Sequence, residues 1–430
     1  MIRISRILSC GLLLVLTGCS SLQSFDSNWI NSILYTPTPA PVSTATRTSQ
    51  PTPGLQTATA APEPAVTEPT VLRIWIPPQF NPNTNSTAAA MLKQKLTTFE
   101  AEHPGFTVDV RVKSEVGEAD LLNSLAITSM AAPSALPDLI ALPRASLEAA
   151  AEKRLVKPLD DLAAELQNMA WYPYARELGM VNGTMYGLPF AGDALVIIYR
   201  PELVWIKNWD GILLSESNLI FPAADLRAQV GLALYVSAGG ELQDAQGKPT
   251  LDQETLSQVL ELFARGRSAG IFPDAASNLA SEEQAMQEYR ARRAEMVIAH
   301  YSQFRSAQDG LLQPLMGLDV EHLTIATGSV WALTSQKPET QELSLELAES
   351  LMAEDFLPRW INESGYLPTY PASVTGPAAE SVAAVIQAAQ LGPSDQVMQA
   401  LGPLMQEAIL RVLDGEQPEV VARSIVEKLK

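Results

Sequence analysis

The sequence predicts an α/β protein with two lobes, and three observations carry this prediction. Stretches typical of β-strands alternate with stretches typical of amphipathic helices from Val71 onwards. The alternation starts again after an apolar stretch that ends at Tyr199. The folded part has about 360 residues, which exceeds what one hydrophobic core usually serves, so two lobes suit it better than one oversized sheet.

The first lobe is expected to begin with a βαβ unit, because parallel strands need a right-handed crossover of this length. The expected elements are, in order, a strand at 71–76, a helix, a strand at 106–112, a helix at about 118–131, a strand at 137–142 and a helix at about 145–154.

The second lobe is expected to follow a strand at 195–199, which is apolar at every position and therefore typical of a strand buried on both faces. The elements expected after it are helices near 222–236, 252–268 and 281–293, strands at 294–300 and 324–334, and helices near 338–353, 377–390, 394–414 and 417–429.

Residues 1–19 predict an export signal. Arg3 and Arg6 form a basic start, and residues 7–16 form an apolar stretch about half as long as a membrane-spanning helix. The segment Leu16-Thr17-Gly18-Cys19 resembles the bacterial lipobox, which implies a signal peptide at 1–18 and diacylation of Cys19. Two acyl chains would anchor the chain stably to the membrane, on its extracytoplasmic side.

Cysteine and charge exclude several classes of function. The only cysteines are Cys10 and Cys19, so the mature folded part would hold no thiol, no disulfide and no thiolate metal site. The 48 acidic and 29 basic residues give a formal charge of −19, which becomes −21 once the signal peptide is lost. Such a charge repels phosphate backbones, so nucleic acid is not an expected partner.

A Pro/Thr-rich segment separates the anchor from the folded part. Residues 36–70 contain 8 Pro and 10 Thr, a composition that cannot build a core. We expect a disordered linker that could reach roughly 110 Å at about 3.1 Å per residue. Residues 19–35 are expected to be the lipidated N-terminus and a spacer.

Eight stretches in chain order resemble the bacterial extracellular solute-binding proteins of family 1, the lipid-anchored receptors of ABC importers that include maltose-binding proteins. They are Leu72–Ile76, Pro137–Ile140, Leu155–Asp160, Asn182–Ala191, Ala238–Lys248, Arg292–Val297, Gly328–Leu333 and Ser364–Pro368. The chain departs from the family at Arg200-Pro201, where an Asn-Lys pair is usual.

The resemblance implies a periplasmic-binding-protein fold of type II, with two lobes, a mixed and mostly parallel sheet flanked by helices in each, and three interlobe crossings. The ligand would lie in the cleft, and the lobes would close on it by hinge bending. By analogy, the first lobe would comprise 71–190 plus 324–357, and the second 191–323 plus 358–430.

The resemblance also implies a ligand site. Binding a polyol calls for planar hydrogen-bonding side chains and for aromatic faces. Asp193 and Tyr301 stand at positions of ligand contacts, with Gln303 as a further hydrogen-bonding group. The alternatives are a solvated hinge charge for Asp193 and packing for Tyr301.

Four further positions have two interpretations. Gly239 and Gly240 allow close approach of a ligand to the backbone, or they make a turn. Trp331 and Trp75 face either the cleft or the core. The remaining large aromatic residues are expected to pack: Trp205, Trp209, Trp360 and Tyr366.

The loop after the third strand departs from the maltose binders, which carry an acidic and a basic residue there. This chain has Arg144 followed by Ala145 in the acidic position. This departure argues against a maltose-like pocket, and Arg144 leaves room for an anionic or differently decorated ligand. A saccharide remains the first expectation because it is the family's commonest ligand.

The sequence does not support an enzyme. Its three histidines are scattered without metal-ligand spacing, and no Gly-x-Ser-x-Gly or phosphate-binding loop occurs. The carboxylate pairs Asp160-Asp161 and Glu282-Glu283 are expected on solvated faces, and His300 on the rim of the cleft. No cofactor and no metal are expected.

The sequence and the resemblance thus predict a monomeric, lipid-anchored receptor that captures a small solute and delivers it to ABC permease subunits. The family makes a saccharide the expected solute. The alternative is a ligand-sensing or adhesin-like lipoprotein without transport. A secreted hydrolase is the third alternative.

Overall fold

The computed structural model describes residues 70–429, except 116, 118, 160–168, 204–205, 308, 335–337, 372–373 and 375–377. The predicted signal peptide, Cys19, the spacer and the linker up to residue 69 lie outside the described residues, and so do Trp205 and Asp160-Asp161. The segment Val66–Lys430 forms one compact unit.

A nine-stranded sheet organises this unit, and its main path has the order β2-β1-β3-β10-β6-β8-β7, with β11 beside β10 and β9 beside β6. The strands are β1 (Thr70–Ile76), β2 (Phe106–Val112), β3 (Leu139–Pro143), β6 (Leu188–Tyr199), β7 (Leu219–Ile220), β8 (Met296–His300), β9 (Leu311–Pro314), β10 (Thr324–Leu333) and β11 (Ala389–Leu391). A small hairpin joins β4 (Met180–Val181) and β5 (Thr184–Met185).

The sheet is mixed. Strand β1 runs parallel to β2 and β3, whereas β10 runs antiparallel to both β3 and β6. Strand β6 is in turn antiparallel to β8 and β9. The mixed α/β fold is confirmed. The sheet is less parallel than expected, because its two central strands, β10 and β6, pair antiparallel.

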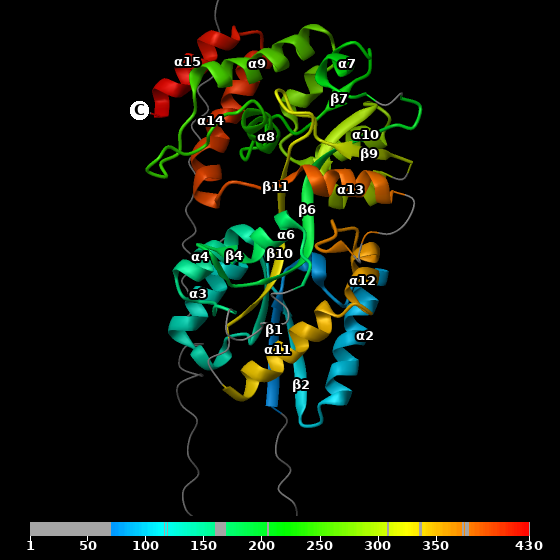
Figure 1. Ribbon diagram of the computed structural model, residues 1–430, viewed down its shortest axis with the longest axis vertical. Helices are drawn as coiled ribbons and strands as arrows, with labels where there is room; N and C mark the ends of the chain where they lie inside the picture. Colours follow the sequence, from blue (N-terminus) through cyan, green and yellow to red (C-terminus); the bar gives the residue numbers. More distant parts are fainter. Residues whose placement is uncertain are drawn as a thin grey trace, which may run out of the picture. The chain divides into compact units, whose positions relative to one another are not determined.

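Helices cover both faces of the first-lobe strands (Figure 1). They are α2 (Thr87–Glu102), α3 (Leu121–Ala131), α4 (Arg144–Glu152), α6 (Pro173–Gly179), α11 (Pro338–Met352) and α12 (Leu357–Ser364). The period-two alternation of β1 divides its side chains between two cores: Ile74 packs in the core with α2 and α12, and Trp75 packs in the core with α3 and α4.

The second lobe gathers around the later half of β6. Its helices are α7 (Trp209–Leu213), α8 (Gln229–Ser237), α9 (Gln253–Ser268), α10 (Glu282–Arg290), α13 (Ala379–Ala388), α14 (Asp395–Leu413) and α15 (Pro418–Leu429). Leu195 and Ile197 of β6 are buried in its main core, which includes apolar residues of α8, α9, α14 and α15.

Two strands belong to both lobes. Residues 188–194 of β6 pair with β10, and residues 195–199 pair with β8. Strand β10 pairs with β3 at 329–333 and with β11 at 324–326. The two predicted sheets are therefore joined into one hydrogen-bonded sheet.

The segment Leu357–Ser364 departs from the predicted lobe boundary. It forms α12, whose Trp360 and Ile361 pack with Phe80 and Phe99 in the first-lobe core. The boundary at 357/358 therefore does not follow the packing. The sequence signal was weak because a short helix between two lobes has an apolar face that either lobe could bury.

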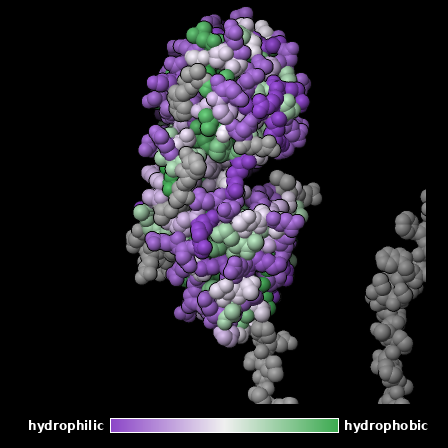
Figure 2. Space-filling model, turned by 90° about the vertical axis from the view of Figure 1, so that its right-hand side faces the viewer, coloured by the Kyte–Doolittle hydropathy of each residue, from purple (hydrophilic) through white to green (hydrophobic). Residues whose placement is uncertain are grey.

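The surface of the described part is mainly hydrophilic, with small scattered apolar patches (Figure 2). None of the described helices combines the length and the apolar composition that a membrane crossing requires.

Candidate functional site

The candidate site gathers residues that follow the carboxyl ends of strands. The segments after β1, β2 and β3 supply Gln79, Glu115 and Arg144 from the first lobe. The loop after β7 supplies Arg227, and β8 leads into η4 (Tyr301–Ala307). Ligands of α/β sheets bind at such carboxyl edges, because loops there converge without disturbing the sheet.

Asp193 lies in β6, opposite Thr327 of β10. The residue is 8% exposed, and its Oδ1 accepts hydrogen bonds of 3.0 Å from the backbone N–H groups of Ala194 and Ser302. Burial raises the pKa of Asp193, while the charge of His300 and the hydrogen bonds from Ser302 act in the opposite direction. The carboxylate thus ties β6 to the start of η4.

His300 and Glu282 form a close pair beside Asp193. His300 Nδ1 donates to Glu282 Oε1 at 2.5 Å, with side-chain exposures of 15% and 23%. Burial opposes the imidazolium, but the charge and hydrogen bond of Glu282, helped by Asp193, raise the pKa of His300 to about 9. His300 Nε2 is buried and has no hydrogen-bond partner among the described residues.

Arg227 lies close enough to charged groups of both lobes to act on their pKa values. Its backbone N–H donates to Asp225 Oδ1 at 3.1 Å. Its guanidinium charge acts on Asp225 and His300 in the second lobe and on Glu115 in the first. Gln79 Nε2 donates to Glu115 Oε2 at 2.8 Å, which connects the segments that follow β1 and β2.

The Glu115 carboxylate is partly desolvated although the residue as a whole is exposed. This desolvation raises its pKa, and Gln79 and Arg227 act against the rise. Tyr366 lies near the same group: burial raises the pKa of its hydroxyl, and the charges of Asp193 and Glu115 add to the effect. Burial and Asp193 likewise raise the pKa of Tyr301 to about 12.

A cavity of about 300 Å³ lies on one side of this cluster. Ser302 and Gln303 of η4 line it together with first-lobe residues, among them Gln79 and Tyr366. The ring of Tyr366 adds aromatic surface, whereas Phe80 and Trp360 at the same wall are only 3% and 4% exposed. The cavity therefore combines amide and hydroxyl groups with an aromatic ring, the combination that suits a polyol.

Glu115 lines a larger cavity of about 630 Å³. Its first-lobe wall includes Glu115, Ala145 and Glu148, and its second-lobe wall includes Arg227 and Asp395. Small-molecule sites commonly have volumes of roughly 300 to 1,000 Å³, so both cavities have the size of ligand sites.

The two tryptophans named from sequence lie in the core. Trp331 is 4% exposed and stacks on Phe190, with ring centroids 4.6 Å apart. Trp75 is 3% exposed, and Lys113 Nζ lies 4.9 Å from the centroid of its ring. Core packing is thus the interpretation that the structure supports for both residues.

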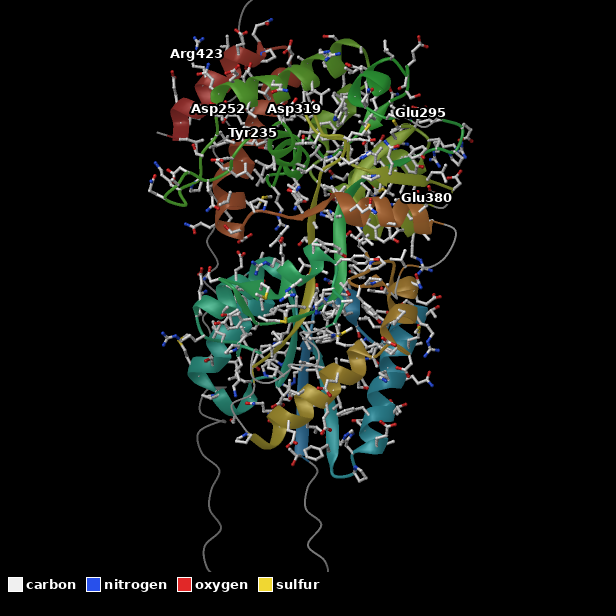
Figure 3. All side chains as sticks on the ribbon, viewed as in Figure 1. Tyr235, Asp252, Glu295, Asp319, Glu380 and Arg423 are labelled. Atoms are coloured by element: carbon white, nitrogen blue, oxygen red, sulfur yellow. The ribbon has the colours of Figure 1, made fainter. Side chains whose placement is uncertain are left out.

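The two glycines end α8 in the second lobe. A Cβ atom on Gly240 would collide with the ring of Tyr235, whose hydroxyl accepts a 2.6 Å hydrogen bond from the Asp252 backbone N–H. Tyr235 and Asp252 lie together in the second lobe (Figure 3). Gly239 has a φ of +80°, which fits the turn. Neither glycine lines the cavities described above.

Sequence reasoning missed several residues of this cluster: Gln79, Glu115, Asp225, Arg227, Glu282 and Ser302. A signal existed for Glu115, since it follows the expected strand at 106–112 at its carboxyl end. Arg227 offered none, because the two-residue strand β7 before it was not expected. Glu282 offered none, because an acidic residue in the first turn of a helix is usually solvated. Its pairing with His300 corrects the expectation of a solvated face.

No group of three or more His, Cys, Asp or Glu side chains able to hold a metal ion occurs within the described part of the chain.

Solved structures similar to this chain include several maltose-type binding proteins. MalE3 of T. maritima, bound to maltose, is 18% identical with a TM-score of 0.65, and the match covers 84% of this chain and 99% of that one. MalE from Bdellovibrio bacteriovorus, bound to maltotriose, is 18% identical with a TM-score of 0.63, covering 84% and 98%. The cyclic alpha-maltosyl-1,6-maltose binding protein of Arthrobacter globiformis is 14% identical with a TM-score of 0.66, covering 84% and 99%.

At such low sequence identities, the TM-scores show that the chain shares the two-lobe fold of these proteins. The comparison with curated proteins found no match. The sequence model of the bacterial extracellular solute-binding proteins matches residues 94–388, about two thirds of the chain, and the chain therefore belongs to that family.

Proposed function

We propose that the protein is the saccharide-binding receptor of an ABC importer and that it binds its ligand between the two lobes. The carrying observation is that Gln79, Tyr366, Ser302 and Gln303, from both lobes, line one cavity beside the buried carboxylate of Asp193. Hydroxyl, amide and carboxylate groups beside aromatic rings are the side chains that recognise sugar hydroxyls and ring faces.

The proposed contacts are Asp193, Tyr301, Gln303 and Arg144, joined by Glu115 and Arg227. Asp193 Oδ1 already accepts two backbone N–H groups, which fix the carboxylate in place. A group held in this way loses little conformational freedom when a ligand binds. The similar structures bound to maltose and maltotriose support a saccharide as the ligand class.

Closure around the ligand would turn on three segments: β6, β10 and the stretch near Leu367. Gly192 of β6 and Leu367 exchange backbone hydrogen bonds of 3.0 and 2.7 Å. The Tyr174 hydroxyl donates to Pro368 O at 2.5 Å. These contacts would hold the three segments together at one point while the lobes rotate about it.

The lipobox-like sequence before Cys19 supports anchoring by two acyl chains, with the Pro/Thr-rich segment 36–70 as a tether. Such a tether would let the receptor reach permease subunits in the same membrane. The permease would recognise the closed form, because only closure fixes the outer faces of the two lobes relative to each other.

A thermal-shift screen of the purified full-length chain tests the proposal. The probes are maltotriose, other mono- and oligosaccharides, polyols, amino acids and polyamines. A ligand that binds only the folded state stabilises it by about 2.7 kcal/mol at a hundredfold excess over Kd, which raises the melting temperature measurably. We expect a saccharide to give this shift.

The variants Asp193→Ala and Tyr301→Ala should each abolish most of the saccharide shift. Trp331→Ala is the control, because it should lower the melting temperature through loss of core packing, yet keep the ligand-induced shift. A saccharide shift that survives Asp193→Ala would refute the site, and a screen in which no saccharide binds would refute the ligand class.

A further inference from the structure

A third cavity lies between Arg144 and Arg227. Its volume is about 40 Å³, room for a group the size of a carboxylate but not for a sugar ring. Arg144 belongs to the first lobe and Arg227 to the second, and both line it. Ala145, Glu148, Arg227 and Asp395 also line the cavity of about 630 Å³, so the small cavity opens beside the large one.

Two of the three nitrogen atoms of the Arg144 guanidinium have no hydrogen-bond acceptor among the described residues. Its side chain is 13% exposed, and only Nη2 is paired, with Glu148 Oε1 at 2.6 Å. Nε and Nη1 are buried and have no hydrogen-bond partner among the described residues. Unsatisfied donors on a buried charge are costly, and a native site that keeps them usually receives an acceptor from elsewhere.

Arg227 faces the cavity from the other lobe. Its charge acts on Glu115, Asp225 and Glu282, but among the described residues its guanidinium forms an ion pair with Asp395 alone. Its Nη2 lies 4.0 Å from Asp395 Oδ1, and the two side chains are 58% and 41% exposed. An exposed pair at this distance contributes little binding energy, so Arg227 is free to turn towards a ligand anion. Arginine suits this role because its donors match the geometry of a carboxylate.

Helix ends add to the positive potential. The first residues of three helices line the cavity: Arg144 of α4, Gln229 of α8 and Asp395 of α14. Helices α4 and α8 have neither a side-chain N-cap nor an acidic residue in the first turn. Their partial positive charges therefore remain available to an anion.

We propose that the solute is an acidic oligosaccharide whose carboxylate binds between Arg144 and Arg227, while its sugar rings extend from the adjoining larger cavity past the Glu115–Gln79 pair into the cavity of about 300 Å³. This inference rests on the proposed saccharide function. The larger cavity is lined by five carboxylates, so the sugar hydroxyls and not the ligand's own carboxylate would face them: Glu115, Asp120, Glu148, Glu152 and Asp395. Glu148 uses only Nη2 of Arg144 and leaves Nε and Nη1 to the ligand.

Calorimetric titration of the purified full-length chain tests the inference with matched pairs. Each pair is an acidic oligosaccharide and its methyl ester, which has the same stereochemistry and no charge. The pairs are trigalacturonate, trimannuronate and a glucuronate disaccharide. We expect at least one acid to bind tenfold or more tighter than its ester, because hydrogen bonds to charged groups carry about 1.5 to 3 kcal/mol. Added salt should weaken the acid alone.

Arg227→Gln and Arg144→Gln should each weaken binding of the acid by tenfold or more and binding of the ester by much less, so that most of the preference for the acid is lost. The side chain of Arg227 is 58% exposed, so its replacement keeps the test valid even if Arg144→Gln folds poorly. Arg423→Gln is the matched control: Arg423 is exposed on α15 of the second lobe (Figure 3) and should keep the full preference.

Two results would overturn the inference: no acid binds tighter than its ester, or an acid preference persists in both arginine variants. Maltotriose separates this failure from that of the proposed function. Binding of maltotriose or of any ester without an acid preference leaves the saccharide receptor intact and removes only the carboxylate. Failure of every saccharide removes both.

Discussion

His300 shows how one residue connects the charge of the site to the stability of the fold. Its imidazolium is held by Glu282 and by the charge of Asp193, with Arg227 as the opposing cation. The folded-state pKa of about 9 lies above the ordinary value of about 6.5. The folded state therefore holds this proton more tightly than the unfolded state does.

The stability that His300 contributes should be fully present below about pH 6.5 and lost as the pH rises through about 9. We predict that the free energy of unfolding of the native chain falls relative to that of His300→Gln by up to about 3 kcal/mol between pH 6 and pH 10. Urea unfolding of both chains across this range measures the difference between their free energies of unfolding. The contributions of the other titrating groups are the same in both chains and cancel in this difference. A constant difference would contradict the pairing.

At the residue scale, sequence reasoning found the buried carboxylate but not its neighbours. Asp193 was identifiable from the family resemblance, because it stands just before the apolar strand expected at 195–199. Ser302, Glu282 and Arg227 come from three other elements, and their approach to Asp193 depends on tertiary packing. Trp331 and Trp75 were candidates because of their residue type alone, and both are buried in the core.

At the scale of elements, Gly192 is the position where three segments come closest. It faces Gly328 across the β6–β10 pair and forms a bridge with Leu367. A Cβ atom there would collide with the Tyr174 hydroxyl and lie 2.8 Å from the Leu367 carbonyl oxygen. The absence of a side chain is therefore what lets the Leu367 segment lie against β6.

We predict that Gly192→Ala lowers the free energy of unfolding by about 2 to 3 kcal/mol, the usual cost of overpacking. The control is Gly270→Ala, because a Cβ atom there meets no atom within 4 Å. Only the φ of +74° disfavours alanine at this position, which should lower the free energy of unfolding by about 1 kcal/mol. Chemical unfolding at pH 7 measures both. Equal losses in the two variants would show that Gly192 is not a point of close contact.

Helix and strand positions were largely predictable from periodicity, and the exceptions are informative. The helix expected near 222–236 begins only at Gln229. The residues before it form the loop that carries Asp225 and Arg227, and Ala228 enters the helix with a φ of +43°. The apolar pattern continued through this loop, which concealed the part of the segment that reaches the site.

At the scale of the whole molecule, β6 and β10 decide how the lobes are related. The apolar run of β6 indicated a buried strand, but its sequence did not show that its two halves serve different lobes. Partner choice within a sheet is a long-range property, since each strand is apolar whichever neighbour it has. Lobe membership of α12 was unpredictable for the same reason.

The central claim is that a solute binds between the lobes and draws them together. The most direct measurement is the distance between spin labels at E152C and Q396C, in a chain that also carries C10S and C19S. Glu152 and Gln396 are exposed and lie on the first-lobe and second-lobe walls of the larger cavity. A label pair at E152C and N123C, both in the first lobe, is the control.

Saturation with the saccharide that gives the thermal shift should shorten the E152C–Q396C distance by several ångströms and leave the E152C–N123C distance unchanged. A bound saccharide that leaves the distance between the lobes unchanged would contradict binding by closure of the two lobes.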